Sequence, residues 1–294
     1  MDNPRVAIVI PTFNHAHFLR TALDSVRAQT ISNWEAIVVN NFSADDTIAV
    51  VESYDDPRIR LVNFANHGII AAGRNHGLAL TQAPFVAFLD SDDFWYPEKL
   101  ARCLDKLSQG FDLVCHGEVW VGSGDRRRIV YYGPEDRASY MKLLLEGNCI
   151  STSAVVARRE WLERVGAFSV QPSFVTAEDY ELWLKLARDG ARIGFIDELL
   201  GEYLIHEGNQ SRAALRNMNA VMAVFEHHRA ALDSAPATCL RRREALIIYG
   251  GARGLQDCGQ YRQAWPYFID AVRRYPWEPK FYAAMMLNAF RQRP

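Results

Sequence analysis

The first hundred residues alternate between short apolar runs and amphipathic stretches. Residues 6–10 form an unbroken apolar run, as expected of a strand covered on both faces. Residues 18–26 then carry apolar side chains at helical spacing. The same alternation continues, with strands expected at 34–39, 59–62 and 85–89, and helices at 46–54, at 71–80 and from Pro97. The pattern predicts an α/β domain with a mostly parallel central sheet and helices on both faces.

After about residue 112 the pattern changes. Strands are expected at 113–119 and 129–132, and a helix at 176–189 that Gly190 closes. From about Ala213 onward the apolar spacing is helical throughout. We therefore expect a main domain over residues 1–211 and a C-terminal helical appendage over residues 212–294.

Three carboxylates directly follow the apolar run 85–89, in the sequence Asp90, Ser91, Asp92 and Asp93. Ligands of parallel α/β sheets bind outside the carboxyl ends of the strands, where these side chains are expected to lie. Clustered carboxylates repel one another unless a cation is present, and such oxygen donors suit Mg²⁺ or Mn²⁺ together with substrate phosphates. A plain acidic turn before the helix that starts near Pro97 is the alternative.

Composition narrows the class of protein. The 33 basic and 35 acidic residues nearly cancel, so nothing indicates general nucleic-acid binding. The five cysteines are widely spaced without a C-x-x-C motif, which favours reduced thiols over a disulfide framework or a zinc site. No apolar stretch reaches the length of a signal-peptide core or of a membrane span. A cytoplasmic protein is expected.

Four segments, taken in order, resemble the inverting family-two glycosyltransferases. Residues 6–14 are similar to the family's opening strand, and residues 88–93, with Trp95 and Pro97, to its Asp-x-Asp element. Residues 177–183 are similar to its acceptor-side Glu-Asp helix. The loop that follows that helix is matched by Tyr203, His206, Gly208, Asn209 and Ser211. The resemblance covers about the first 211 residues and implies the GT-A fold, which binds a nucleotide-diphospho-sugar at the carboxyl edge of its sheet.

The resemblance also implies roles around the acidic motif. Asp90 would face the ribose and sugar, Asp92 would bind Mn²⁺ or Mg²⁺, and Ser91 would lie in the same donor-binding loop. Asp93 is expected to cap or support that loop. Arg74 falls where the family places a basic residue near the diphosphate, and a guanidinium matches phosphate geometry. A solvated helix arginine is the alternative for Arg74.

Residues after the first two strands would complete the nucleotide pocket. Pro11, Thr12 and Asn14 would form its floor, although a plain strand-to-helix turn would also explain them. After the second strand the chain has Asn40 and Asn41 where relatives carry aspartate. The Asn41 amide can both accept and donate hydrogen bonds, so it could pair with uracil, but without the charge-assisted bond of a carboxylate. A UDP-sugar is therefore the favoured donor.

On the acceptor side, Asp179 is the candidate general base, since inverting transfer needs a carboxylate to deprotonate the attacking hydroxyl. The segment that begins at Thr176 also fits a capping box, in which Asp179 would only satisfy a helix N-terminal amide. Glu178 would bind acceptor hydroxyls or position the loop. His206 could reach the metal or diphosphate, or it could be an ordinary surface histidine. No ligand-like grouping is evident for the remaining candidates His15, His17, His227 and His228.

These features together predict a metal-dependent glycosyltransferase that inverts the anomeric carbon. Its partners would be a nucleotide-diphospho-sugar and a glycan or lipid-linked acceptor, in cell-surface polysaccharide synthesis, with peripheral contact at the inner face of the membrane. A nucleotidyltransferase or dehydrogenase would need a glycine-rich phosphate loop, and residues 11–17 contain no glycine. A catalytically degenerate nucleotide-sugar-binding or scaffold protein that uses the helical appendage is the non-enzymatic alternative. The sugar, the linkage and the oligomeric state stay open.

Overall fold

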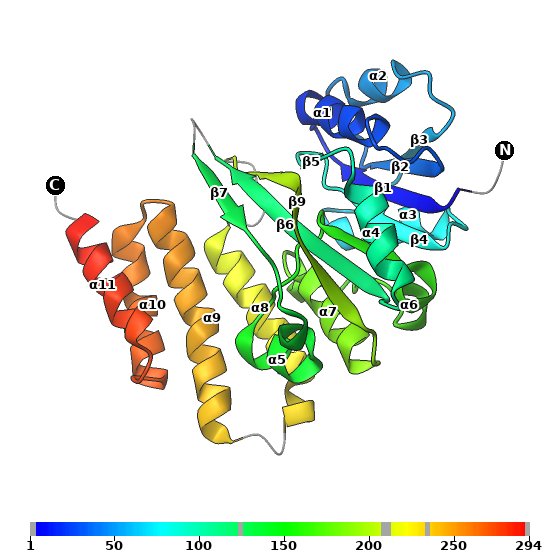
Figure 1. The fold of residues 1–294 in the computed structure, drawn as a ribbon. Coiled ribbons are helices and arrows are strands. Elements are labelled where there is room, and N and C mark those ends of the chain that lie inside the picture. The colour runs from blue at the N-terminus through cyan, green and yellow to red at the C-terminus, as the bar shows by residue number, and fades with distance from the viewer. Residues whose placement is uncertain (1–3, 123–125, 207–212, 233–235, 292–294) are drawn as a thin grey trace. The chain divides into compact units, whose positions relative to one another are not determined.

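The computed structural model describes residues 4–122, 126–206, 213–232 and 236–291. The chain divides into two compact units (Figure 1). The first comprises Met1–Leu143, Asn148–Val170 and Glu181–His206, and the second Leu144–Gly147, Gln171–Tyr180 and Glu207–Pro294. The boundary predicted between residues 211 and 212 falls outside the described residues and stays a prediction, as do the roles of Gly208, Asn209 and Ser211.

The first unit is built on one sheet whose strands run in the order β3-β2-β1-β4-β8-β6-β9-β5, with β7 paired to β6. Its strands are β1 (Val6–Thr12), β2 (Trp34–Asn40), β3 (Ile59–Asn63), β4 (Phe85–Phe88), β5 (Phe94–Trp95), β6 (Leu113–Val121), β7 (Arg127–Val130), β8 (Val155–Arg158) and β9 (Ile193–Leu204). The helices in this unit are α1 (Ala16–Arg27), α2 (Thr47–Glu52), α3 (Ile70–Ala79), α4 (Lys99–Ser108) and α6 (Arg159–Arg164). The predicted α/β class is confirmed.

The parallel arrangement holds for the strands of the alternating half, from β3 through β2 and β1 to β4. Beyond β4 the sheet mixes directions, because β8 pairs antiparallel with both β4 and β6. Strand β9, which the apolar pattern does not predict, lies parallel to β6 and pairs antiparallel with the short strand β5. Its sequence carries Asp197 and Glu198 in the middle, and the pairing with β6 shifts register near Gly117. This interruption hides the strand from a periodicity test.

Helices cover both faces of the sheet. On one face, α1, α2 and α4 pack over the even-numbered residues of β1 and β2, in a core that includes Ile8, Leu23 and Leu104. On the other face, α3 lies against β1 and β2. Gly77 of α3 allows this approach, since a Cβ there would stand 2.5 Å from Val9 Cγ1. The two layers fix the carboxyl ends of β1, β2 and β4 at one edge of the sheet.

We expect Gly77→Ala to destabilise the protein by about 1–3 kcal/mol, because the added methyl overpacks α3 against β1. Gly250→Ala is the matched control, since Gly250 lies inside a helix with no atom within 4 Å of the added Cβ. That substitution should stabilise by about 0.5–1 kcal/mol. Urea unfolding followed by circular dichroism checks both, and equal effects of the two substitutions would contradict the packing assigned to α3.

The second unit is helical over most of its length. It contains α8 (Ala214–His228), α9 (Ala237–Asp257), α10 (Tyr261–Arg274) and α11 (Pro279–Arg291), and α9, α10 and α11 run side by side (Figure 1). Buried apolar residues of these three helices form small shared clusters around Phe268 and Phe281. The short helix α5 (Tyr140–Glu146) ends within this unit, and α7 (Glu178–Arg188) begins in it and continues into the first unit. Among the described residues, no helix combines the length and apolar character needed to cross a membrane.

Candidate functional site

Parallel pairing brings three strand ends to the same edge of the sheet. Val9 of β1 pairs with Phe88 of β4, and Thr12 of β1 pairs with Asn40 of β2. The residues that follow each strand therefore emerge together, and they include most of the predicted donor-site residues. Pro11 and Thr12 are buried at the end of β1. The hydroxyl of Thr12 is buried there without a hydrogen-bond partner among the described residues.

Arg74 and Asp90 form an ion pair at this edge, with 2.6 Å between Arg74 Nη2 and Asp90 Oδ1. The Arg74 side chain is only 4% exposed, and its guanidinium lies 5.4 Å from the centre of the Phe168 ring. A solvated arginine, the alternative considered for this position, is therefore wrong. Helix α3 therefore places the Arg74 guanidinium beside Asp90, the first aspartate of the acidic motif. At this position it could bind an anionic ligand such as a diphosphate.

Asp92 contacts His206, the residue that follows the end of β9 by two positions. Asp92 Oδ2 and His206 Nε2 are 2.8 Å apart, and their side chains are 12% and 20% exposed. Two ligands at right angles around a small octahedral ion stand about 3 Å apart, given metal–ligand distances near 2.1 Å. The carboxylate is a ligand that Mn²⁺ and Mg²⁺ prefer, and the imidazole is a nitrogen donor of the kind that binds transition-metal ions. The residues present thus fit a divalent cation.

His15 belongs to the same group of residues, although the sequence offered no reason to include it. Its Nδ1 is 2.9 Å from Ser91 Oγ, and its ring centre is 6.0 Å from that of His206. Burial lowers the pKa of His15, while the negative charge of Asp92 opposes that shift. The signal that could have found it is topological. His15 follows β1 and Ser91 follows β4, and the two strands are parallel neighbours.

Asp93 supports the motif from beneath, as predicted. Its carboxylate accepts hydrogen bonds from the Ser153 hydroxyl at 2.5 Å and from the Leu204 amide at 3.1 Å. Ser153 Oγ also accepts the amide hydrogen of Asp90. Burial and the nearby carboxylates of Asp92 and Glu118 raise the pKa of Asp93 well above its usual range. The network ties the acidic turn to β9 and to the segment before β8.

The loops after β1 and β2 are joined by side-chain hydrogen bonds. Asn14, whose φ of 53° is left-handed, accepts the Ala44 amide hydrogen at 2.8 Å, and Ser43 Oγ accepts that of Asn14 at 2.9 Å. Asn40 is fully buried and binds Ser43, so it has a structural role. Asn41 is half-buried and its side-chain oxygen accepts the Asn66 amide hydrogen at 3.0 Å. Since an amide oxygen has two lone pairs, Asn41 keeps the capacity to pair with a base.

A buried polar cluster lies beneath the acidic motif. Tyr132 donates its hydroxyl hydrogen to Glu118 at 2.6 Å, and Trp120 Nε1 donates to the Tyr132 oxygen at 3.2 Å. Burial raises the pKa of Glu118 to about 7, although the Tyr132 hydrogen bond opposes the shift. Burial also lowers the pKa of Lys99 to about 7, and this ammonium stands 3.4 Å from the centre of the Trp95 ring.

We expect the stabilising contribution of protonated Glu118 to fall as pH rises from about 5 to 7, by up to about 1.4 kcal/mol per pH unit. In that window folded Glu118 keeps a proton that the unfolded chain has released, so unfolding is favoured at higher pH. Two other buried groups act in the opposite sense, because burial lowers the pKa of His116 to about 3 and that of Lys99 to about 7, so the free energy of unfolding is compared between the wild type and Glu118→Gln. Urea unfolding at pH 5, 6 and 7 should show the wild type losing stability relative to Glu118→Gln as pH rises. The same pH dependence in both proteins would refute the raised pKa of Glu118.

Glu178 and Asp179 open helix α7, in the second unit. Thr176 before them has φ of 87°, an unfavourable conformation for a β-branched residue and one that concentrates at functional sites. Glu178, which is buried, accepts the Thr176 amide hydrogen at 2.8 Å, so it positions the loop. Asp179 is half-buried and accepts the Tyr180 amide hydrogen at 2.7 Å. In a capping box that starts at Thr176, Asp179 would accept the amide hydrogen of Thr176. In the structure Glu178 accepts that hydrogen instead.

The amino-acid sequence matches a known protein family and individual relatives within it. The sequence model described as Glycosyl transferase family 2 matches residues 7–166, more than half of the chain. A relative from Escherichia coli, UDP-Glc:alpha-D-GlcNAc-diphosphoundecaprenol beta-1,3-glucosyltransferase WfgD, is 33% identical over 190 residues. The alignment covers 64% of this chain and 72% of the relative.

Solved structures share the fold. The mannosyltransferase PcManGT from Pyrobaculum calidifontis, in complex with GDP-Man and Mn²⁺, superposes with a TM-score of 0.63 at 18% identity, covering 98% of this chain and 85% of that one. S. aureus TarS 1-349 in complex with UDP-GlcNAc gives a TM-score of 0.61 at 16% identity, covering 85% and 81%. The predicted GT-A fold is therefore confirmed, while the roles of individual site residues stay predictions.

Proposed function

Because the chain belongs to glycosyl transferase family 2 and is a glycosyltransferase, we propose that it moves a sugar from a UDP-sugar to a hydroxyl group of a lipid-linked glycan, with inversion. The observation that carries this proposal is the set of charged side chains at the edge where β1, β2 and β4 end. There Asp90 and Asp92, which belong to one acidic turn, pair with Arg74 of α3 and with His206 after β9. The turn combines a cation for a diphosphate with ligands for a metal ion.

Two considerations favour uridine as the base. Asn41 is half-buried beside the loop after β1, and its amide can accept and donate as uracil requires. WfgD, the relative at 33% identity, is named for a UDP-Glc donor. Pro11, Thr12 and Asn14 would line the floor of the same pocket, as the family resemblance implies.

Asp92 and His206 would hold Mn²⁺ or Mg²⁺. A divalent cation bound there would neutralise charge that develops on the leaving diphosphate. Arg74 would add a fixed positive charge next to the diphosphate, and Asp90 would orient that guanidinium while accepting a hydrogen bond from the ribose or sugar. Ser153 and Asp93 keep the turn in the conformation that presents these groups.

Asp179 would act as the general base. It would take the proton from the acceptor hydroxyl while the oxygen attacks the anomeric carbon on the face opposite the leaving nucleoside diphosphate. Glu178 would hold the strained Thr176 loop in place, as its hydrogen bond to that amide indicates. The acceptor named for WfgD, a diphosphoundecaprenol-linked GlcNAc, supports a lipid-linked acceptor and work at the inner face of the membrane, in the synthesis of a surface polysaccharide.

The proposal is tested by incubating the enzyme and Mn²⁺ with a panel of UDP-, GDP- and dTDP-sugars and a synthetic diphospholipid-linked GlcNAc. We expect UDP release and a disaccharide-lipid product from one UDP-sugar. NMR of the product should show a new β-linkage from an α-configured donor. Transfer from a GDP-sugar alone, or retention of configuration, would refute the proposal.

A further inference from the structure

Helix α11 carries apolar residues on two opposite sides. The buried side is made by the apolar residues Phe281 and Ala284 together with the polar Asn288. Its packing includes hydrogen bonds from Gln256 Nε2 to the Ala284 carbonyl and to the Asn288 side chain. The outer side presents Tyr282, Met286 and Phe290, four residues apart, at 43%, 59% and 66% exposure. A helix at the surface of a globular protein normally carries charged or polar residues on that side.

Trp277 extends this surface. It lies in the turn before α11 and is 81% exposed, the largest exposure among the large apolar side chains described. Tyr282 donates its hydroxyl hydrogen to the Pro276 carbonyl at 2.9 Å, which fixes the turn against the first exposed residue of the stripe. An exposed tryptophan and tyrosine next to an apolar stripe are the side chains that favour the boundary between water and lipid. We call Trp277, Tyr282, Met286 and Phe290 the α11 apolar surface.

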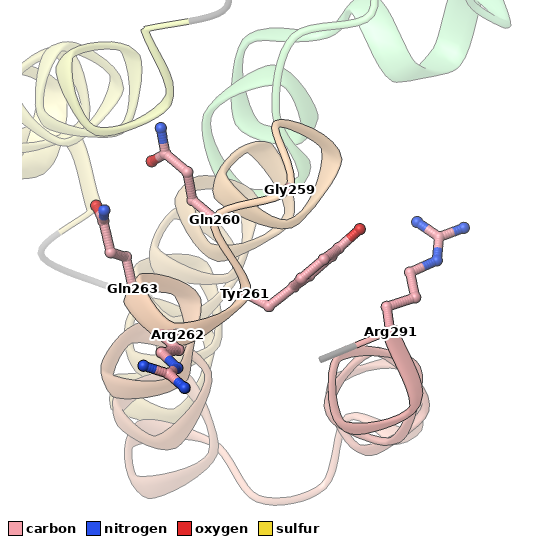
Figure 2. A pocket seen from close by; sticks show the side chains of 6 residues that line it. All are labelled: Gly259, Gln260, Tyr261, Arg262, Gln263 and Arg291. Atoms are coloured by element: carbon pink, nitrogen blue, oxygen red, sulfur yellow. The ribbon is translucent and has the colours of Figure 1, made fainter. Parts of the chain in front are cut away.

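Most charges around this surface are basic, and Glu278, the acidic residue next to Trp277, is paired with Arg242. No Asp or Glu occurs after Glu278, whereas Lys280 and Arg291 stand at the two ends of α11. Beside the C-terminal end of α11, Arg291, Arg262 and Tyr261 line a pocket, and the two arginine side chains point away from each other (Figure 2). Residues 212–294 contain 13 Lys and Arg against 6 Asp and Glu, a net charge of +7 that leaves −9 for residues 1–211. The positive charge is concentrated in the part of the chain that carries the α11 apolar surface.

We propose that the α11 apolar surface docks on an anionic lipid bilayer. An interfacial helix inserts its apolar face at the boundary of headgroups and acyl chains, while basic residues at its margins contact anionic headgroups. The 13 residues of α11 extend about 20 Å, less than the roughly 30 Å core of a bilayer, so the helix lies in the membrane plane. Lys280 and Arg291, at the two ends of α11, would contact headgroup phosphates. The inference concerns lipid binding and does not depend on the proposed sugar transfer.

Flotation of the full-length protein with vesicles tests the proposal. One vesicle is phosphatidylcholine alone, and the other contains about 30% phosphatidylglycerol, which supplies the negative surface potential. The wild type should float with the anionic vesicles, and added salt should weaken the association. Met286→Glu and Phe290→Glu should each reduce the partition coefficient at least about tenfold, because a charge replaces an inserted apolar side chain. The double variant Lys280→Glu/Arg291→Glu should bind less to the anionic vesicles, whereas its binding to phosphatidylcholine vesicles should not change.

Leu80→Glu is the matched control. It introduces the same charge at an apolar residue that is 37% exposed at the end of α3, and it should leave vesicle binding unchanged. Circular dichroism of each variant checks the fold. Failure of the wild type to float, or equal flotation of Met286→Glu, would overturn the proposal. It would also be overturned if the wild type were a dimer that Met286→Glu dissociates, because the surface would then bind a second copy of the chain.

Discussion

Asp179→Asn should lower kcat for sugar transfer by about 10²–10⁴-fold while leaving the fold and donor binding unchanged. Asparagine has the shape of aspartate and can still accept the Tyr180 amide hydrogen, so the start of α7 keeps its hydrogen bond. What the amide cannot do is take a proton from the acceptor hydroxyl. The loss should therefore fall on kcat, and the KM for the UDP-sugar should stay within a few fold of the wild-type value.

Asp257→Asn is a suitable control for that experiment, because this exposed aspartate at the end of α9 also belongs to the second unit. It should transfer sugar at the wild-type rate. If Asp179→Asn kept most of its activity with normal folding, Asp179 would be excluded as the base. If it instead lost helicity or donor binding, its carboxylate would be a structural group at the start of α7.

Asp92→Asn should reduce kcat/KM by about 10²–10³-fold and remove the response to Mn²⁺. The substitution keeps the side-chain size but removes the negative charge that pairs with His206 across 2.8 Å. A neutral amide is a weaker ligand for a divalent cation, so charge on the leaving diphosphate would be less well neutralised. Initial rates over a titration of Mn²⁺ measure the effect directly.

Asp105→Asn, at an exposed position of α4, serves as the control for that charge change. Its rate and Mn²⁺ response should match those of the wild type. Activity of Asp92→Asn within about threefold of the wild type at every Mn²⁺ concentration would contradict a metal-binding role for Asp92.

The alternating half of the chain could be predicted from its sequence because its strands are buried on both faces. The continuous apolar runs of β1, β2 and β4 are a direct consequence of helices covering the sheet on each side, and their ends locate the acidic motif. Strand β9 escaped prediction because Asp197 and Glu198 interrupt it where the pairing with β6 shifts register. The antiparallel joining of β8 to β4 depends on contacts between distant segments, which local patterns do not encode.

Within the site, the sequence identified most of the charged residues but not all of the contacts between them. Arg74 was a candidate from its position, yet only the structure shows that it is buried and paired with Asp90. His15 could not be selected among the histidines, because its proximity to Ser91 arises from the pairing of β1 with β4. Ser153, which supports Asp90 and Asp93, lies about sixty residues further along the chain and belongs to no motif.

Thermal unfolding with nucleotides tests whether the edge where β1, β2 and β4 end is a metal-dependent UDP-sugar site. A ligand that binds only the folded protein raises its Tm. We predict that UDP raises the Tm when Mn²⁺ is present, that GDP, CMP and dTDP do not, and that Asp92→Asn abolishes the UDP effect. An unchanged Tm with UDP and Mn²⁺ would exclude a UDP site in this protein, and the same increase in Asp92→Asn would exclude Asp92 as a metal ligand.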